Sequence, residues 1–205
     1  MSRVDALDAD AIRAACAGQV VGGCVFVFDE VVSTNDVVAQ MAASHAAGLV
    51  VLAERQTAGR GQYGRRWESA AGKGLWMSVL LRPRIPIAES ARVTDLLACA
   101  IADTVTESTG LAATIKSPND IYLAGRKVAG VLVEMRVEPG GGYCAAAGMG
   151  INLNHASDDF PPELRATAIS LALATGRSVD RQQFAIALLR NLETQSRALT
   201  GLRPS

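Results

Sequence analysis

The order of the apolar segments restricts the fold of this chain more than its composition does. Apolar runs of strand length follow one another in groups, whereas segments with helical periodicity are few and widely spaced. A doubly wound parallel sheet needs a helix after each strand, so this order favours an α+β fold with a mixed β-sheet flanked by helices. The predicted strands cover residues 24–28, 49–53, 75–81, 114–116, 121–123, 128–137 and 143–153, and the predicted helices cover residues 5–16, 35–44, 87–109 and 180–199.

The charge balance lacks the basic excess that is usual for a nucleic-acid-binding protein. The 205 residues include 20 Lys and Arg and 20 Asp and Glu, so the formal net charge at pH 7 is zero. No apolar run approaches the roughly 20 residues that span a bilayer, and residues 1–10 lack the features of a signal peptide. We expect a cytoplasmic protein that binds neither DNA nor membrane and folds as a single domain over residues 1–205.

The cysteines and histidines form no recognisable metal or nucleophile motif. The four cysteines are scattered without a C-x-x-C spacing, and the two histidines lie far apart. We therefore predict no metal site and no Ser-His-Asp or Cys-His catalytic system. The cysteines are interpreted as small buried apolar side chains in a reducing compartment. His155, just after the last predicted strand, is interpreted as a loop residue rather than as a nucleotide ligand.

A glycine- and arginine-rich loop follows the second predicted strand. Its segment Gly59-Arg60-Gly61-Gln62-Tyr63-Gly64 matches the G-x-G-x-x-G pattern of dinucleotide-binding proteins. That motif must open a helix, and residues 65–74 have no helical pattern, so we reject a Rossmann fold. Glycines permit a close approach of the backbone to a ligand, and arginines can bind phosphate or carboxylate oxygens. We predict an anion-binding loop in which Trp67 orders when ligand binds; the alternative is a solvated surface loop.

Three more segments contain turn residues or glycines. They lie within predicted strands or at the ends of predicted strands. Residues 116–120 read Lys-Ser-Pro-Asn-Asp and, taken alone, are explained as a turn, because Asn and Asp side chains hydrogen-bond to their own backbone. Gly130, inside the strand 128–137, indicates a bulge or a backbone approached by a ligand. Residues 148–154 read Gly-Met-Gly-Ile-Asn-Leu-Asn. Each segment alone is compatible with a scaffold role, and only their joint occurrence in this order indicates a function.

Taken together, the motifs resemble the catalytic domain of biotin protein ligases, also called holocarboxylase synthetases. The resemblance covers nearly the whole chain, from about residue 25 to residue 199, and implies a fold shared with class II aminoacyl-tRNA synthetases and lipoate ligases. This agrees with the α+β fold inferred from the order of the strands. The matching motifs are Ser33-Thr34-Asn35, residues 54–67 (ERQTAGRGQYGRRW), residues 74–83 (GLWMSVLLRP), and residues 116–120, 126–134 and 148–152.

The resemblance implies a two-step reaction that uses biotin and ATP with Mg²⁺. The biotin carboxylate attacks the α-phosphate of ATP, which gives biotinyl-5′-adenylate and pyrophosphate. The ε-amine of a lysine on a biotin carboxyl carrier domain then attacks this mixed anhydride. Such chemistry needs positioned substrates and cations rather than a covalent nucleophile, which fits the missing nucleophile motif.

The resemblance also assigns roles to individual residues. Three cations are implied to be catalytic, with Arg60 at the carboxylate and phosphate, Lys116 at the α-phosphate and Lys127 at the acyl phosphate. The implied biotin-binding residues are Ser33, Thr34, Asn35, Gln56, Arg60, Gly61, Gln62, Lys127 and Gly130. The implied ATP- and adenylate-binding residues are Gly59, Arg65, Trp67, Lys116, Asn119 and Asn152.

Departures from the family pattern leave other functions open. Gln62 stands where the family usually has the second arginine of G-R-G-R, and Ser117 stands at the tryptophan of K-W-P-N-D. We also expect neither the N-terminal helix-turn-helix nor the C-terminal SH3-like domain of many members. The alternatives are a non-catalytic protein that binds biotin or biotinyl-adenylate, and a lipoate-type acyl ligase or transferase, against which the polar set at residues 33–35 argues. A homodimer formed through open sheet edges is compatible with the sequence.

Overall fold

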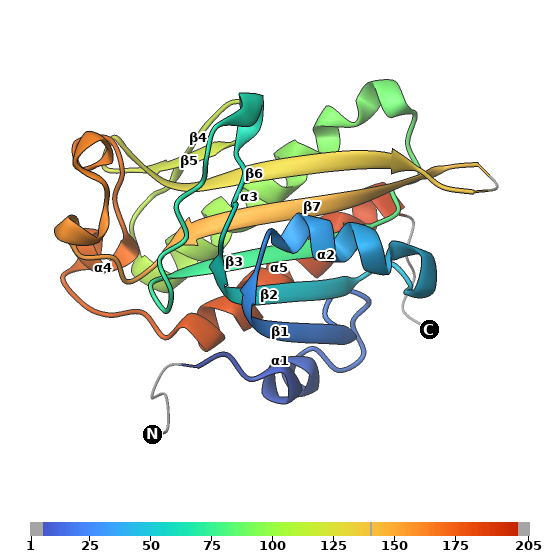
Figure 1. Cartoon of the computed structure of the whole chain (residues 1–205), viewed down its shortest axis with the longest axis horizontal. Coiled ribbons are helices and arrows are strands. Elements are labelled where there is room, and N and C mark those ends of the chain that lie inside the picture. The colour runs from blue at the N-terminus through green and yellow to red at the C-terminus, as the bar shows by residue number, and fades with distance from the viewer. Residues whose placement is uncertain (1–5, 140, 201–205) are drawn as a thin grey trace.

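The computed structural model describes residues 6–139 and 141–200, which build one mixed sheet with helices on both faces (Figure 1). The strand order is β1-β2-β3-β7-β6-β5-β4; β1 and β2 are parallel, and all other neighbouring strands are antiparallel. This confirms the α+β mixed sheet predicted from the sequence. The strands are β1 (Cys24–Val31), β2 (Leu49–Gln56), β3 (Gly74–Leu81), β4 (Thr114–Lys116), β5 (Asp120–Leu123), β6 (Arg126–Val137) and β7 (Tyr143–Asn152).

The predicted helices are present, with changes at their ends. Of the helix predicted over 5–16, residue 5 lies outside the described residues, and the helix begins at Ala9, where the Asp8 side chain caps it by accepting hydrogen bonds from the N–H groups of Asp10 and Ala11. The segment 87–109 divides into a 3₁₀ turn and a helix that ends at Gly110, which has a φ of +74°. A short helix after residue 170 was not predicted. The helices are α1 (Ala9–Ala15), α2 (Thr34–Met41), α3 (Ala91–Thr109), α4 (Leu171–Thr175) and α5 (Arg181–Thr200).

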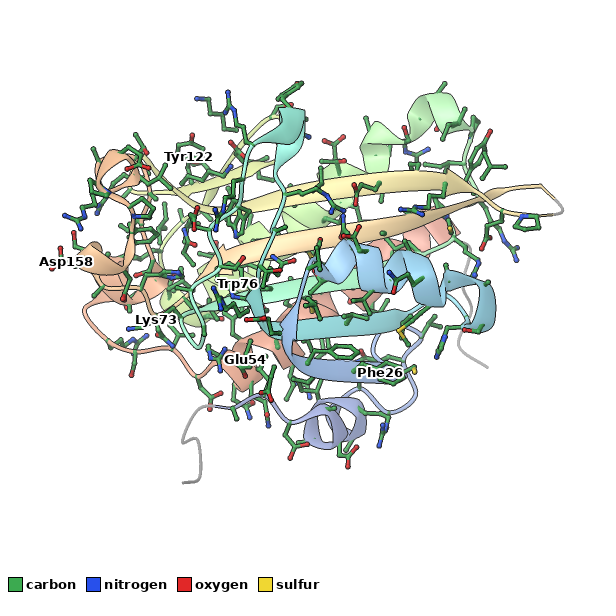
Figure 2. The ribbon with its side chains drawn as sticks, in the orientation of Figure 1. Phe26, Glu54, Lys73, Trp76, Tyr122 and Asp158 are labelled. Carbon is green, nitrogen blue, oxygen red and sulfur yellow. The ribbon has the colours of Figure 1, made fainter. Side chains whose placement is uncertain are left out.

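One face of the sheet packs on α1, α3 and α5 and forms the main core. In Figure 1, α3 and α5 lie behind the strands. The apolar positions predicted for α3 are all buried in this core: Val93, Leu96, Leu97, Ala100 and Ile101. Glu54 near the end of β2 (Figure 2) and Arg181 at the start of α5 form a buried ion pair of 2.9 Å across this side of the molecule. The core therefore fixes β2 just before Gln56, which belongs to the functional site.

The opposite face is only partly covered, by α2. Val38 of α2 and Ala42, just after its end, pack on Leu49, Val51 and Leu80 of the sheet. Figure 1 shows α2 in front of the strands, with the segment between β2 and β3 crossing the remaining part of the face. Residues of β6 and β7 lie beneath this segment, and the motif residues gather there.

The described part of the chain bears on the predictions about cysteines, membrane-spanning helices and metal sites. Cys16 and Cys144 are buried, as predicted, whereas Cys24 and Cys99 are half-buried, and all four are free thiols. In residues 6–139 and 141–200, no helix has both the length and the apolar character needed to cross a membrane. Over the same ranges, no group of three or more His, Cys, Asp or Glu side chains is placed to hold a metal ion.

Candidate active site

The glycine- and arginine-rich loop, residues 57–73, forms a hairpin-like crossing over the sheet instead of opening a helix. The N–H of Trp67 donates to the carbonyl of Gly59 (2.9 Å), and the N–H of Gly61 donates to the carbonyl of Arg65 (2.7 Å). A Cβ on Gly59 would lie 2.6 Å from the Trp67 carbonyl oxygen, so only glycine fits at this crossing point. This geometry agrees with the rejection of a Rossmann fold.

The indole of Trp67 lies on two glycines of the sheet. Gly130 of β6 and Gly150 of β7 are paired, and a Cβ on them would lie 3.0 and 2.5 Å from the Trp67 ring, respectively. The register shift between β5 and β6 lies before Ala129, so Gly130 is not itself the bulge. Gly130 is instead a site of close approach, and the group that approaches it is a side chain of the same chain.

A small cavity of about 50 Å³ lies between the start of α2 and the loop. The residues that the resemblance assigned to biotin meet there, although they come from four different segments. Ser33 holds the N-cap position of α2, but its hydroxyl makes no capping hydrogen bond. The lining includes Ser33, Thr34, Asn35, Gln56, Arg60, Gly61, Gln62, Lys127 and Gly130.

Hydrogen bonds within the protein orient the polar groups of this cavity. The Thr34 hydroxyl donates to Oε1 of Gln56 (3.2 Å), and the Gln56 amide donates to the Ser69 hydroxyl (3.1 Å). The fully buried Ser78 hydroxyl lies 2.6 Å from Oγ1 of Thr34 and 2.7 Å from Oδ1 of Asn35. Its single proton can serve only one of these acceptors at a time. The polar groups are therefore fixed before any ligand arrives.

Asn35 lies directly on the backbone of β7. A Cβ on Gly148 would lie 2.4 Å from Oδ1 of Asn35, so the glycine makes room for the amide. On its other side, Nδ2 of Asn35 donates to Oε2 of Glu134 (2.7 Å) and to the Leu132 carbonyl (3.3 Å). Glycines 130, 148 and 150 thus have one function: they let side chains from the loop and from α2 lie on the sheet.

Arg60 is held by two carboxylates. Its guanidinium donates to both oxygens of Asp36 (2.9 and 2.7 Å) and to Oε2 of Glu134 (3.1 Å). The hydrogen bonds from Arg60 lower the pKa of Asp36 below its usual value, and the same contacts raise the pKa of Arg60. All three side chains are about one third exposed, so the cluster is screened in part by solvent.

Lys127 lies at the meeting point of two cavities. Its ammonium is 2.6 Å from the Asp120 carboxylate and 5.2 Å from the centre of the Trp67 ring, a cation–π arrangement. On the other side of Trp67 lies a large cavity of about 830 Å³, bounded by the loop, by β5 and by residues 152–168. Six residues line both cavities: Gln56, Gly61, Gln62, Trp67, Asn119 and Lys127.

The large cavity contains most of the residues that the resemblance assigned to the nucleotide. Arg65, Asn119 and Asn152 all line it, and Asn152 donates from Nδ2 to the Ile169 carbonyl (3.2 Å). Figure 2 shows Tyr122 and Asp158, both lining residues, at the same end of the molecule. Its volume and its mixed polar lining are in the usual range of small-molecule sites.

His155 borders the large cavity within a run of aromatic rings. It stacks on Phe160 with a centroid distance of 4.8 Å and meets the edge of Trp76 at 5.9 Å. Burial lowers the pKa of His155 to about 4, so the ring is neutral near pH 7. Its Nδ1 atom is buried without a hydrogen-bond partner. His155 lies in a loop, as the sequence predicted, and it is also among the residues that line the large cavity.

Two of the assigned residues do not line either cavity. Lys116 lies on the exposed edge strand β4, with its ammonium 5.4 Å from the centre of the Tyr122 ring. The reason is that β4 is the outermost strand of the sheet, and the contact that Lys116 makes is with the ring of Tyr122, a residue that lines the large cavity. Gly59 lies at the crossing point of the loop, where its carbonyl accepts the hydrogen bond from the N–H of Trp67.

Sequence reasoning assigned no site role to Asp36, Ser78, Asp120 and Glu134, and it interpreted His155 only as a loop residue. Glu134 carried a readable signal, because it follows Gly130 at even spacing on one strand and therefore shares its face. Asp36 is adjacent to the Ser33-Thr34-Asn35 motif. Ser78 lies in an apolar strand, and nothing in the sequence indicates that its hydroxyl has a role in the site.

Comparison with known proteins identifies the family. The model of the biotin/lipoate A/B protein ligase family matches residues 27–154, which is more than half of the chain. The chain belongs to this family. It is 40% identical over 171 residues to the bifunctional ligase/repressor BirA of Bacillus spizizenii, covering 83% of this chain and 53% of that protein. It is 37% identical over 155 residues to the biotin–[acetyl-CoA-carboxylase] ligase of Paracoccus denitrificans, covering 74% and 64%.

Solved structures of family members show the same fold. The biotin protein ligase of Aquifex aeolicus in complex with biotin and ATP aligns with a TM-score of 0.71 and 29% identity, over 84% of this chain and 69% of that one. The ligase of Leishmania major in complex with biotinyl-5-AMP aligns with a TM-score of 0.71 and 26% identity, over 86% and 76%. This family member spans less than two thirds of the length of the Bacillus and Paracoccus proteins.

Proposed function

We propose that this chain is an ATP-dependent biotin protein ligase. It would form biotinyl-5′-adenylate from biotin and ATP and then transfer the biotinyl group to a lysine of a biotin carboxyl carrier domain. The observation that carries the proposal is the pair of cavities that meet at Lys127 and Trp67, one small and lined by amide and hydroxyl groups, the other large and lined by arginines and amides.

The two cavities suit the two substrates. Hydroxyl and amide groups at Ser33, Thr34 and Gln56 match the donors and acceptors of a ureido ring. The large cavity has room for a nucleotide, and Asn152, whose Nδ2 donates to the Ile169 carbonyl, is among the residues that line it. Biotin in the small cavity would direct its carboxylate past Trp67 toward the α-phosphate in the large one. The small cavity holds only about 50 Å³, so the Trp67 indole must shift for the whole ligand to enter.

Residues at the junction would stabilise the charge that develops during adenylation. A carboxylate oxygen bonds to the α-phosphorus, the bond from phosphorus to the bridging oxygen breaks, and pyrophosphate leaves with the electron pair. Lys127 is placed to offset negative charge at that centre, which is the largest usual contribution to such a step. In the second step the lysine amine of the carrier attacks the acyl carbon, AMP leaves, and a proton is lost from the amine.

Magnesium would enter with ATP as part of the substrate. Mg²⁺ is commonly held by one or two protein oxygens together with substrate phosphates, so a dedicated protein cage is not required. Asp120 and Asn119 line the large cavity and supply oxygen groups of the right kind. The Asp120 carboxylate contacts Lys127 at 2.6 Å, which supports a shared role of the lysine and a metal-bound carboxylate at the phosphates.

The proposed partners are biotin, MgATP and a carrier domain, and the proposed location is the cytoplasm. The Bacillus relative is named as a repressor as well as a ligase. The equal numbers of basic and acidic residues support a protein without a DNA-binding surface. The free state of all four thiols supports a reducing compartment.

The test is a biotinylation assay with the purified chain. Biotin, MgATP and a recombinant carrier domain are incubated with the protein, and the intact mass of the carrier is measured. We expect a gain of one biotinyl group, abolished when the acceptor lysine is replaced by arginine. Biotin binding by calorimetry without any carrier modification or ATP–pyrophosphate exchange would refute the ligase and identify a biotin-binding protein instead.

A further inference from the structure

Arg60 is the glycine-loop cation that the resemblance directs at the substrate, yet its guanidinium already faces two carboxylates. We propose that Arg60 is a positioning residue, which couples the loop to the small polar cavity through Glu134 and does not itself bind the substrate carboxylate or phosphate. This proposal rests on the proposed function, because the cavity is the one assigned to biotin.

The charges around Arg60 argue against a direct anion-binding role. Arg60 makes a two-pronged contact with Asp36 and a further contact of 3.1 Å with Glu134, so one positive charge meets two negative ones. A substrate anion would have to displace a carboxylate from the guanidinium. Lys127 lines both cavities and, among the described residues, is ion-paired only with Asp120 at 2.6 Å, so it is the better-placed cation.

Glu134 is the link between the loop and the cavity. Its Oε2 atom accepts a hydrogen bond from Arg60 (3.1 Å) and another from Nδ2 of Asn35 (2.7 Å). The Asn35 amide is thereby turned so that Oδ1 faces Ser78, which lies in turn beside Thr34. A loop that moves away would release Glu134 and loosen the orientation of Asn35. Loop position and cavity geometry are thus joined by one carboxylate.

Strand β6 contacts the loop at two points on the same face. Trp67 rests near Gly130, and Arg60 binds Glu134, four residues further along the strand. Residues at even spacing on a strand point to one side, so both contacts fix the loop against a single rigid element. The two contacts hold opposite limbs of the loop, before and after its tip.

The experiment compares three variants with a matched control. Glu134→Gln removes one of the two negative charges that Arg60 binds, and Asp36→Asn removes the other. Arg60→Lys keeps the positive charge but loses the planar fork. The control is Glu138→Gln. Glu138 pairs with Arg82 at 2.8 Å with similar exposure, but it lines neither cavity.

Two readouts are measured on each folded variant, after thermal unfolding has confirmed that Glu134→Gln and Glu138→Gln are comparably stable. The first is the rate of trypsin cleavage under native conditions after Arg65 and Arg66, bonds that all variants retain. The second is the dissociation constant for biotin. We expect Glu134→Gln and Asp36→Asn to speed cleavage about three- to tenfold, and Glu134→Gln to weaken biotin binding by a similar factor, with Glu138→Gln unchanged in both.

Glu134→Gln separates the two roles. If Arg60 bound the substrate anion itself, loss of the competing Glu134 charge would leave the biotin affinity unchanged or raise it, whereas a residue that holds the loop through Glu134 predicts weaker binding. Arg60→Lys loses the planar fork in either case, and we expect it to behave like Glu134→Gln. Wild-type cleavage rates in Glu134→Gln and Asp36→Asn, or unchanged or tighter biotin binding in Glu134→Gln, would overturn the proposal. If the wild-type chain binds no biotin, the proposed function is wrong, and the cleavage rates alone then decide whether Glu134 holds the loop.

Discussion

The Lys127 ammonium lies over the indole of Trp67, 5.2 Å from the ring centre, where the small and large cavities meet. Trp67 is itself seated on paired glycines of β6 and β7, so the sheet sets its position. The Asp120 carboxylate holds the other side of the ammonium at 2.6 Å. The Asp120 contact does not depend on the indole, so it can hold the ammonium when a ligand shifts Trp67. A cation fixed before the reaction costs little reorganisation when charge develops beside it, which is the requirement for electrostatic catalysis.

Replacement of Lys127 by methionine is expected to impair adenylation far more than biotin binding. Loss of a preorganised cation at the reaction centre should slow biotin-dependent ATP–pyrophosphate exchange by about 100-fold. Lys116→Met is the matched comparison, since Lys116 lines neither cavity, and we expect a loss below about tenfold. An equal loss in both variants would favour the role that the family resemblance gave to Lys116.

Substitution of Gly148 by alanine is expected to weaken biotin binding. The new Cβ would lie 2.4 Å from Oδ1 of Asn35, whose amide is tied to Glu134, Leu132 and Ser78 and has little freedom to move. We expect a loss of at least about tenfold in affinity, measured by calorimetry. Gly23→Ala serves as the control, because its Cβ would meet only ordinary contacts at 3.4 Å and beyond. Unchanged affinity in Gly148→Ala would show that Asn35 does not shape the cavity.

The sequence predicted the scaffold better than it predicted the chemistry at the junction. Strand order and helix periodicity identified the mixed sheet, since each apolar run carries its own local signal. The roles of Arg60 and Lys116 depend instead on pairings between distant segments. Asp36 and Glu134 are far from Arg60 in sequence, and their carboxylates determine what its guanidinium can bind. The position of Lys116 on the outermost strand likewise follows from the sheet order, which no local pattern encodes.

Gln62→Arg is expected to retain the adenylate more tightly than the natural chain does. Gln62 lines both cavities, at the position where the family resemblance expects an arginine. A guanidinium there would add a charge-assisted contact, for which about 1.5 to 3 kcal/mol is typical before solvent screening reduces it. We expect slower release of free biotinyl-adenylate, measured by filtration and chromatography after a single turnover. Equal release from the two proteins would show that Gln62 does not set the retention of the intermediate.

His155 makes stability depend on pH below the neutral range. Burial lowers its folded-state pKa to about 4, against about 6.5 in an unfolded chain, so the folded protein binds fewer protons between these values. The neutral His155 ring therefore makes its full contribution to the free energy of unfolding above about pH 6.5. This contribution, at most about 3 kcal/mol, is lost as the pH falls toward 4. The neighbouring Asp159 carboxylate, whose pKa is lowered by hydrogen bonds from Ala156 and Lys73, titrates below this window.

The test replaces His155 with phenylalanine, which can keep the stack on Phe160 without a titrating group. Free energies of unfolding are measured by urea denaturation near pH 7 and near pH 4.5. We expect the free energy of unfolding of the wild type to fall over this interval by about 2 kcal/mol more than that of His155→Phe. His45→Gln controls for the general effect of removing a histidine. The same loss in the wild type and His155→Phe would mean that the imidazole is not held neutral by its buried site, and that other groups cause the acid sensitivity.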